Sequence, residues 1–195
     1  MVVLEVTQTA QRAPAKGRIL EVASHLFYSE GIRAVGVDRI IGASAVTKAT
    51  FYKHYRAKEN LIVIYISARH YRVRADVEAL VENSPDSRSA LINLIGAILA
   101  EIAAPGFRGC PFINAAMEYP DATHPVRSVV TEHREWYVGV LTGLLRDAGH
   151  PAPGDGADEF VLAHDGAMAG GLAGDSIAAS AAFGRIAGRV ISPTG

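Results

Sequence analysis

The residues best suited to chemistry lie in the run KATFYKHY, at positions 48–55 of the 195-residue sequence. If this run is helical, its exposed side chains are basic, hydroxyl and aromatic: Lys48, Thr50, Tyr52, Lys53 and His54. Its buried side then consists of Ala49, Phe51 and Tyr55. Small and hydroxyl residues approach base edges in the major groove, while lysine and tyrosine reach phosphates. The run therefore fits contact with double-stranded DNA, although a solvated amphipathic hairpin has the same pattern.

The distribution of charge favours a polyanionic partner for the same part of the chain. The formal net charge is −1, but residues 1–74 contain twelve Lys or Arg against five Asp or Glu, a net charge of +7. Residues 75–195 contain seven basic and fifteen acidic residues, a net charge of −8. One end of such a chain attracts nucleic acid and the other is repelled by it.

The elements that must position these residues all have helical periodicity, and no segment alternates as a strand does. Caps, glycines and prolines divide the pattern into about nine helices. We expect them near residues 15–30, 37–45, 48–55, 58–82, 111–119, 126–148, 157–173 and 176–190, with one more between the turn at 83–86 and the break at Pro105-Gly106. The predicted fold class is all-α.

The first three of these helices are short and basic, and a tight turn joins the second to the third. This arrangement is typical of a helix-turn-helix. Thr47 precedes the third helix, where its hydroxyl can cap free backbone amides. Lys58 opens the next helix, whose N-terminal amides also favour a phosphate.

The segment from Arg18 to Ala68 resembles the N-terminal domain of the TetR family of transcriptional repressors. The matching features are LFYSEGI, then VDRIIGASAVTKATFYKHY, then a basic turn and KENL. The resemblance implies a helix-turn-helix domain at residues 15–57 and a helical ligand-binding and dimerisation domain at 58–191. Residues 1–14 are expected to be a disordered arm, in which Arg12, with the neighbouring Lys16 and Arg18, reaches an adjacent groove or stays solvated.

The resemblance also assigns contacts to individual residues. It implies phosphate contacts by Thr47, Tyr52, His54 and Lys58. It places four residues nearest the floor of the major groove: Lys48, Ala49, Thr50 and Lys53. The sequence departs from the family pattern at Val35-Gly36, where a capping serine or threonine is usual, so Asp38 is expected to cap instead. It also has Ala45 where the family favours glycine in the turn, which predicts an altered or strained turn.

The last two predicted helices are candidates for a homodimer interface. They contain many small residues: Gly166, Ala167, Ala169, Gly170, Gly171, Ala173 and Gly174. Small residues let helices approach closely, and glycine-rich helices need packing to be stable. Close packing within one chain is the alternative. Asp175 or Ser176 is expected to cap the last helix.

Aromatic and hydrogen-bonding residues in the middle of the chain suggest a pocket for a small-molecule effector. The candidates are Phe107, Cys110, Phe112, Asn114, Met117, His133 and Tyr137. For each of them singly, ordinary core packing is the alternative. A lone cysteine at a helix start invites a redox role through a lowered pKa. A metal site among Glu118, Asp121, His124 and His133 lacks tight ligand spacing, so a solvated loop is preferred.

The expected function is a one-component regulator, most often a repressor in the family. It would bind palindromic operator DNA as a dimer and be released by a small-molecule effector. The alternatives are an effector-independent or redox-governed DNA-binding factor and, remotely, a small-molecule enzyme. No nucleophile–base pair, metal set or phosphate loop supports an enzyme, and no cofactor is implied. One cysteine excludes an internal disulfide, and no secretory signal or membrane span is expected, which favours the cytoplasm. The identity of the effector, the operator and the direction of regulation stay open.

Overall fold

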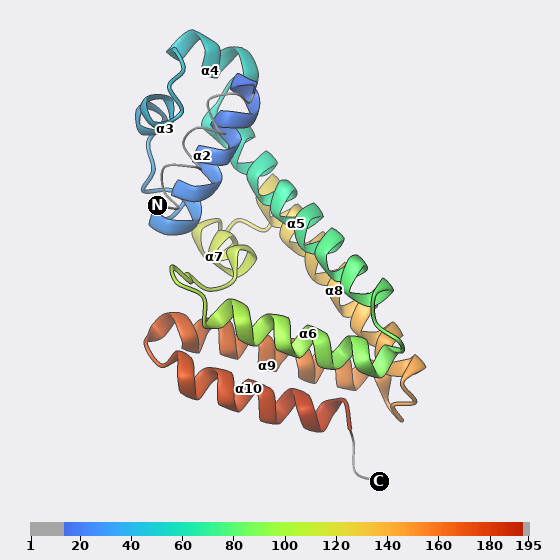
Figure 1. Cartoon of the computed structure of the whole chain (residues 1–195). Coiled ribbons are helices and arrows are strands. Elements are labelled where there is room, and N and C mark those ends of the chain that lie inside the picture. Colours follow the sequence, from blue (N-terminus) through green and yellow to red (C-terminus); the bar gives the residue numbers. More distant parts are fainter. Residues whose placement is uncertain (1–13, 193–195) are drawn as a thin grey trace.

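The structure is a computed structural model that describes residues 14–192, and this part contains nine α-helices and no strand (Figure 1). The prediction of an all-α fold is confirmed. The helices are α2 (Ala15–Glu30), α3 (Val37–Ala43), α4 (Lys48–Tyr55), α5 (Lys58–Glu82), α6 (Ser87–Ile102), α7 (Pro111–Glu118), α8 (Pro125–Asp147), α9 (Pro153–Ala173) and α10 (Ser176–Val190). The expected arm lies outside the described residues except for Pro14. Between residues 14 and 192 no helix combines the length and the apolar character needed to cross a lipid bilayer.

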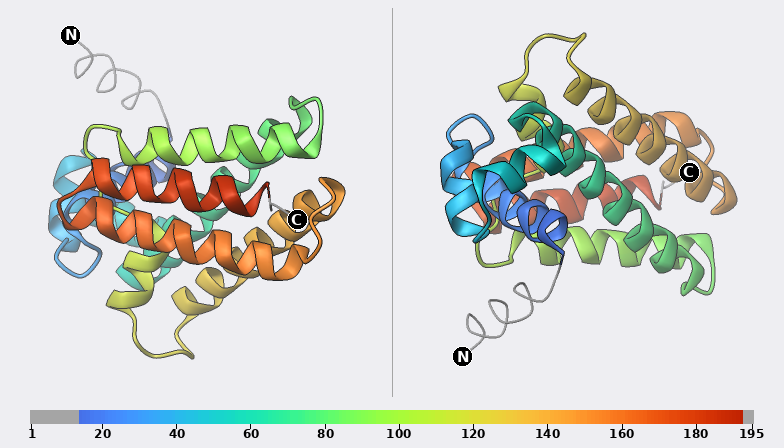
Figure 2. Two further views of the ribbon diagram at one scale, coloured as in Figure 1. Left: turned by 90° about the horizontal axis from the view of Figure 1, so that it is seen from below. Right: turned by 90° about the horizontal axis from the view of Figure 1, so that it is seen from above.

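Helices α2, α3 and α4 gather around the first turns of α5, which then runs alongside α8 (Figure 1). Helices α6, α10 and α9 lie side by side at the far end of α5 (Figures 1 and 2). Each end has its own hydrophobic cluster. The first contains Phe27, Phe51 and Tyr65, and the second contains Leu141 and Phe160. The chain thus has a small helical head and a larger helical body, joined by α5.

The caps explain several of the boundaries. Thr47 Oγ1 accepts a hydrogen bond from Thr50 N at 3.1 Å, which satisfies an amide at the start of α4. Asp175 caps α10 by accepting from Ala178 N at 2.8 Å. The predicted cap by Asp38 is wrong, because α3 begins after Gly36 with no side-chain cap. Asp38 lies in the first turn instead, where a negative charge still suits the helix dipole.

Two other expected boundaries differ from the structure. Helix α3 ends at Ala43 rather than at residue 45. Helix α9 begins at Pro153, four residues before the expected start, although the sequence there is rich in proline and glycine. Proline is accommodated in a first turn because its missing amide has no helical partner there. Gly156 belongs in this turn because it is buried, and a Cβ there would lie 2.9 Å from His150 Cε1.

Part of the glycine-rich pattern in α9 is explained by packing within the chain. A Cβ at Gly171 would lie 3.0 Å from Ile102 Cγ2 and 3.1 Å from Phe107 Cε1. A Cβ at Gly170 would lie 3.4 Å from Ala179 Cβ, on α10. Gly166 has no such neighbour within 4 Å. Glycines 170 and 171 therefore serve the contacts of α9 with the rest of the body.

We expect Gly171→Ala to destabilise the protein by about 1–3 kcal/mol, because the added methyl group overpacks the contact with Ile102 and Phe107. Gly139→Ala in α8 is the matched control, since nothing lies within 4 Å of its added Cβ. It should be neutral or should stabilise the helix by up to about 1 kcal/mol. Urea unfolding followed by circular dichroism measures both, and equal effects would contradict this account.

Candidate DNA-binding surface and ligand cavity

Helix α4 presents a polar face to solvent, and two buried aromatic residues anchor it in the head. Phe51 and Tyr55 are buried one turn apart, and the Tyr55 hydroxyl donates to Lys16 O at 2.7 Å. The exposed residues are Lys48, Ala49, Tyr52 and Lys53, while Thr50 and His54 are half-buried. The expectation that Ala49 lies on the buried side is wrong, because Phe51 and Tyr55 alone fill that side. Its exposure leaves room beside it for a close partner.

The turn before α4 has the strain that its alanine predicts. Ala45 has φ +51°, in the left-handed region that a glycine would adopt without a Cβ penalty. This penalty is about 1–2 kcal/mol. The turn is supported by the buried Ser44, whose hydroxyl donates to Ile40 O at 2.7 Å. Arg18 Nε donates to Ser44 O at 3.4 Å, so this arginine belongs to α2 and contacts the turn rather than extending an arm. Lys16 also lies in α2, not in the arm.

The two lysines Lys48 and Lys58 differ in how far their ammonium groups are exposed to solvent. The Nζ atom of Lys48 lies 3.7 Å from Asp38 Oδ1, and both side chains are exposed. Lys58 is half-buried, with its Nζ atom 3.4 Å from Arg33 O and 5.8 Å from the centroid of the Phe27 ring. Burial lowers the pKa of Lys58. Lys58 is therefore held against the head, whereas Lys48 extends into solvent.

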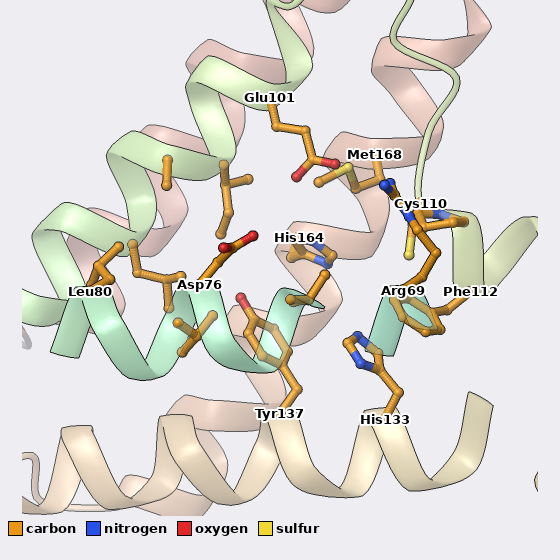
Figure 3. Close-up of a pocket in the computed structure, with 16 residues that line it drawn as sticks. Arg69, Asp76, Leu80, Glu101, Cys110, Phe112, His133, Tyr137, His164 and Met168 are labelled. Carbon is orange, nitrogen blue, oxygen red and sulfur yellow. The ribbon is translucent and has the colours of Figure 1, made fainter. Parts of the chain in front are cut away.

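Helices α5, α6, α7, α8 and α9 contribute to a cavity of about 290 Å³ (Figure 3). Four of the seven predicted ligand residues line it: Cys110, Phe112, His133 and Tyr137. Met117 lines an adjoining hollow of about 370 Å³ that shares these four residues. Asn114 lines neither and donates to Arg108 O at 2.8 Å. Phe107 lines neither and packs beside Gly171.

Four charged or imidazole side chains that line the cavity were not among the residues predicted from the sequence. These are Arg69, Asp76, Glu101 and His164. Arg69 and Asp76 lie on the same face of α5 as the lining residues Val73, Val77 and Leu80, at spacings of three, four and seven. That helical spacing was the signal that could have identified them.

Stacked rings form one wall of the cavity. The rings of Phe112 and His133 have centroids 3.5 Å apart and planes within 9°. His133 Nδ1 lies 3.1 Å from Nδ1 of the buried His70, so one of these nitrogens carries the shared proton. Burial, and then the neighbouring histidines His70 and His164, lower the pKa of His133 to about 3. His133 is therefore a neutral ring at physiological pH.

Helix α7 connects the cavity wall to the head. Phe112, near its start, lines the cavity and belongs to the head's hydrophobic cluster. Glu118, at its end, accepts hydrogen bonds from Ile32 N at 2.9 Å and Arg33 N at 2.7 Å, in the loop after α2. A carboxylate that accepts two amide hydrogen bonds holds them more strongly than a neutral acceptor does. Helix α7 therefore joins the cavity wall to the head by direct contacts.

The polar residues considered for a metal have other roles. Glu118 binds the loop after α2, and His124 Nδ1 accepts from Val126 N at 3.3 Å at the start of α8. Residues 14–192 contain no group of three His, Cys, Asp or Glu side chains arranged to hold a metal ion.

A lowered pKa of Cys110, the condition for the redox alternative, is contradicted by the burial of its thiol. Burial raises the pKa of this thiol to about 11, although backbone amides of Ile113 and Phe112 act in the opposite direction. Removal of water disfavours the thiolate more than the start of α7 favours it. Cys110 is thus a protonated, weakly nucleophilic residue of the cavity wall at neutral pH.

We expect Cys110 to react with iodoacetamide at pH 7.5 at least tenfold more slowly in the folded protein than in urea, since only the thiolate is nucleophilic. The rate in the folded protein should rise as the pH approaches 11. Mass spectrometry of quenched samples gives both rates. Equal labelling of the folded and unfolded chains would contradict the burial argument.

The comparisons with known proteins agree with this geometry. The family model for bacterial regulatory proteins of the TetR family matches residues 19–63. A TetR-family transcriptional regulator from Streptomyces coelicolor is 38% identical, with a TM-score of 0.87, over 91% of this chain and 94% of its own. The fold is shared by the regulatory protein TetR from Rhodobacter sphaeroides (21% identity, TM-score 0.81, 91% and 99% covered) and a regulator from Agrobacterium tumefaciens (22%, 0.79, 91% and 95%). The chain belongs to the TetR family of transcriptional regulators and is a DNA-binding regulator, not an enzyme.

Proposed function

We propose that this regulator represses transcription by binding a palindromic operator as a homodimer, and that a small molecule in the cavity releases it. The observation that carries the proposal is that α5 and α7 contribute to the cavity and also pack into the head. A ligand that fits better when these helices shift will favour the shifted conformation. The head must then move, because its core contains residues of both helices.

On the DNA side, α4 is proposed to enter the major groove. Lys48, Ala49, Thr50 and Lys53 would lie nearest the bases, and Thr47, Tyr52, His54 and Lys58 would contact phosphates. The exposure of Lys48, Ala49, Tyr52 and Lys53 supports this assignment. The contact between Asp38 and Lys48 should loosen when DNA approaches, because the carboxylate is repelled by the phosphates.

The homodimer is proposed to form through α9 and α10. Three large apolar side chains on these helices are exposed in the single chain: Leu162 at 73%, Leu172 at 40% and Ile177 at 84%. Beside Leu162 is a shallow apolar hollow lined by residues of both helices, including Gly166 and Phe183. An exposed apolar patch of this kind is typical of a protein interface. A two-fold dimer would set the two recognition helices about 34 Å apart, the repeat of successive major grooves.

The first test is selection of bound duplexes from a random pool, followed by a salt titration on the selected sequence. We expect a palindrome whose affinity falls steeply with salt. Lys48→Ala should weaken binding about tenfold, because it removes a side chain placed nearest the bases. Tyr52→Phe, which keeps the edge contact with Phe51, should weaken binding by losing its hydroxyl alone.

Arg146→Ala, at an exposed position at the far end of α8, is the matched control for charge. It should leave the affinity and the salt slope unchanged. Full operator binding by both the Lys48 and Tyr52 variants would refute the assignment of α4. An operator affinity that no small molecule alters would favour an effector-independent DNA-binding factor.

A second test concerns the dimer. Leu162→Asp should produce monomers and weaken operator binding at least tenfold, since a buried, unpaired carboxylate is costly at an interface. Ile92→Asp in α6, where the native side chain is 52% exposed, is the matched control and should stay dimeric. Analytical ultracentrifugation distinguishes the two outcomes, and a dimeric Leu162→Asp variant would exclude this surface.

A further inference from the structure

The cavity has an uneven distribution of charge. Its walls are mainly apolar or aromatic: Val73, Val77, Leu80, Leu94, Ile98, Phe112, Tyr137 and Met168. Among its lining residues, Asp76 and Glu101 are negatively charged and Arg69 is positively charged. His133 contributes no charge at neutral pH, because burial and its neighbouring histidines lower its pKa to about 3. The carboxylates therefore outnumber the cationic side chain.

The two carboxylates point into the cavity from different helices, Asp76 from α5 and Glu101 from α6 (Figure 3). Both residues are exposed, so they lie where the cavity meets solvent. Within residues 14–192 neither carboxylate has a hydrogen bond or an ion pair. A carboxylate without a partner is free to attract a cation that arrives from solution.

The cationic residue lies over an aromatic ring, although its Nε atom is buried without a hydrogen-bond partner within residues 14–192. The Cζ atom of Arg69 lies 5.4 Å from the centroid of the Tyr28 ring, over its face. Its guanidinium group lies at the Cys110 end of the cavity, away from Asp76 (Figure 3). A guanidinium over an aromatic ring is already stabilised by the ring's negative face. The lining therefore has one cationic side chain, at the Cys110 end, against two carboxylates, of which Asp76 lies away from it.

We propose that the effector is an organic cation with an apolar or aromatic body, whose charged group lies between Asp76 and Glu101. This inference rests on the proposed function, because it names the class of molecule that the regulator senses. The apolar body would lie against Val77, Ile98 and Tyr137, deeper in the cavity. The charged group that matches this site is an amine or a quaternary ammonium, since aromatic faces and carboxylates both attract it.

Three ligands with one benzyl body test the charge directly: benzyltrimethylammonium, its neutral isostere neopentylbenzene, and the anion phenylmethanesulfonate. Trp136, the single tryptophan, reports binding by its fluorescence, because its ring centroid lies 5.6 Å from that of the cavity residue His133. We expect the ammonium to bind about tenfold more tightly than the sulfonate at low salt, and less so at high salt, where screening shortens the reach of both carboxylates.

Two isosteric variants test whether Asp76 and Glu101 cause the preference for the cationic ligand. Asp76→Asn and Glu101→Gln should each weaken the binding of the ammonium about threefold, and together about tenfold, since an exposed ion pair contributes modestly to affinity. Neopentylbenzene should bind all variants equally. Glu135→Gln, at an exposed position of α8 outside the cavity lining, is the control and should leave the ammonium unaffected.

Several outcomes would overturn the proposal. One is no detectable binding of the ammonium, and another is tighter binding of the sulfonate, which would point to Arg69 as an anion site. The proposal would also fail if the two variants weakened the binding of neopentylbenzene as much as the binding of the ammonium, because the substitutions would then act through the shape of the cavity rather than its charge. These measurements contain no DNA. If the ammonium binds as expected but leaves the operator complex intact, the charge assignment stands and the proposed release mechanism fails.

Discussion

The fold depends on one rigid helix, α5, that contributes buried side chains to both hydrophobic clusters. Leu61, Ile62, Tyr65 and Ile66, in the first turns of α5, are buried in the head, and Val77 is buried in the body. The helix has 25 residues without a break, so it spans about 37 Å as a single rod. An uninterrupted backbone hydrogen-bond ladder transmits tilt rather than absorbing it. Arg69, Val73 and Asp76 occupy the middle of this rod, between the two anchored ends, and line the cavity there.

Helix α7 provides a second connection between the cavity and the head. Helix α7 has only eight residues, yet Phe112 faces the cavity and Glu118 holds the backbone of the head. Tyr28 adds a contact to the preceding loop, because its hydroxyl donates to Gly109 O at 3.1 Å and accepts from Arg108 N at 3.0 Å. With α5 alone the head could pivot, but with α5 and α7 together its orientation is fixed by two separate attachments. A displacement of α5 relative to α7 therefore changes the orientation of the head.

The sequence predicted local features well and long-range ones poorly. The Thr47 cap and the strained turn at Ala45 were predictable because each depends on neighbouring residues and backbone geometry alone. The start of α9 was mispredicted because proline and glycine read as a loop, whereas the burial of Gly156 depends on His150 and Leu145. The contact from Glu118 to Ile32 joins residues 86 positions apart, and no local pattern encodes it. Asp76 and Glu101 resemble ordinary solvent-facing residues, and only the assembled helices show that they flank a cavity.

The head's hydrophobic cluster also contains Phe112, Ala115, Tyr119 and Val126, which come from the second half of the sequence. The first 57 residues therefore do not carry a complete core. A chimera that joined this recognition segment to the body of another family member would leave those four positions to be filled by unrelated side chains. The unit that evolution can exchange intact is consequently larger than α2, α3 and α4, because it has to include the residues of α7 and α8 that complete their core.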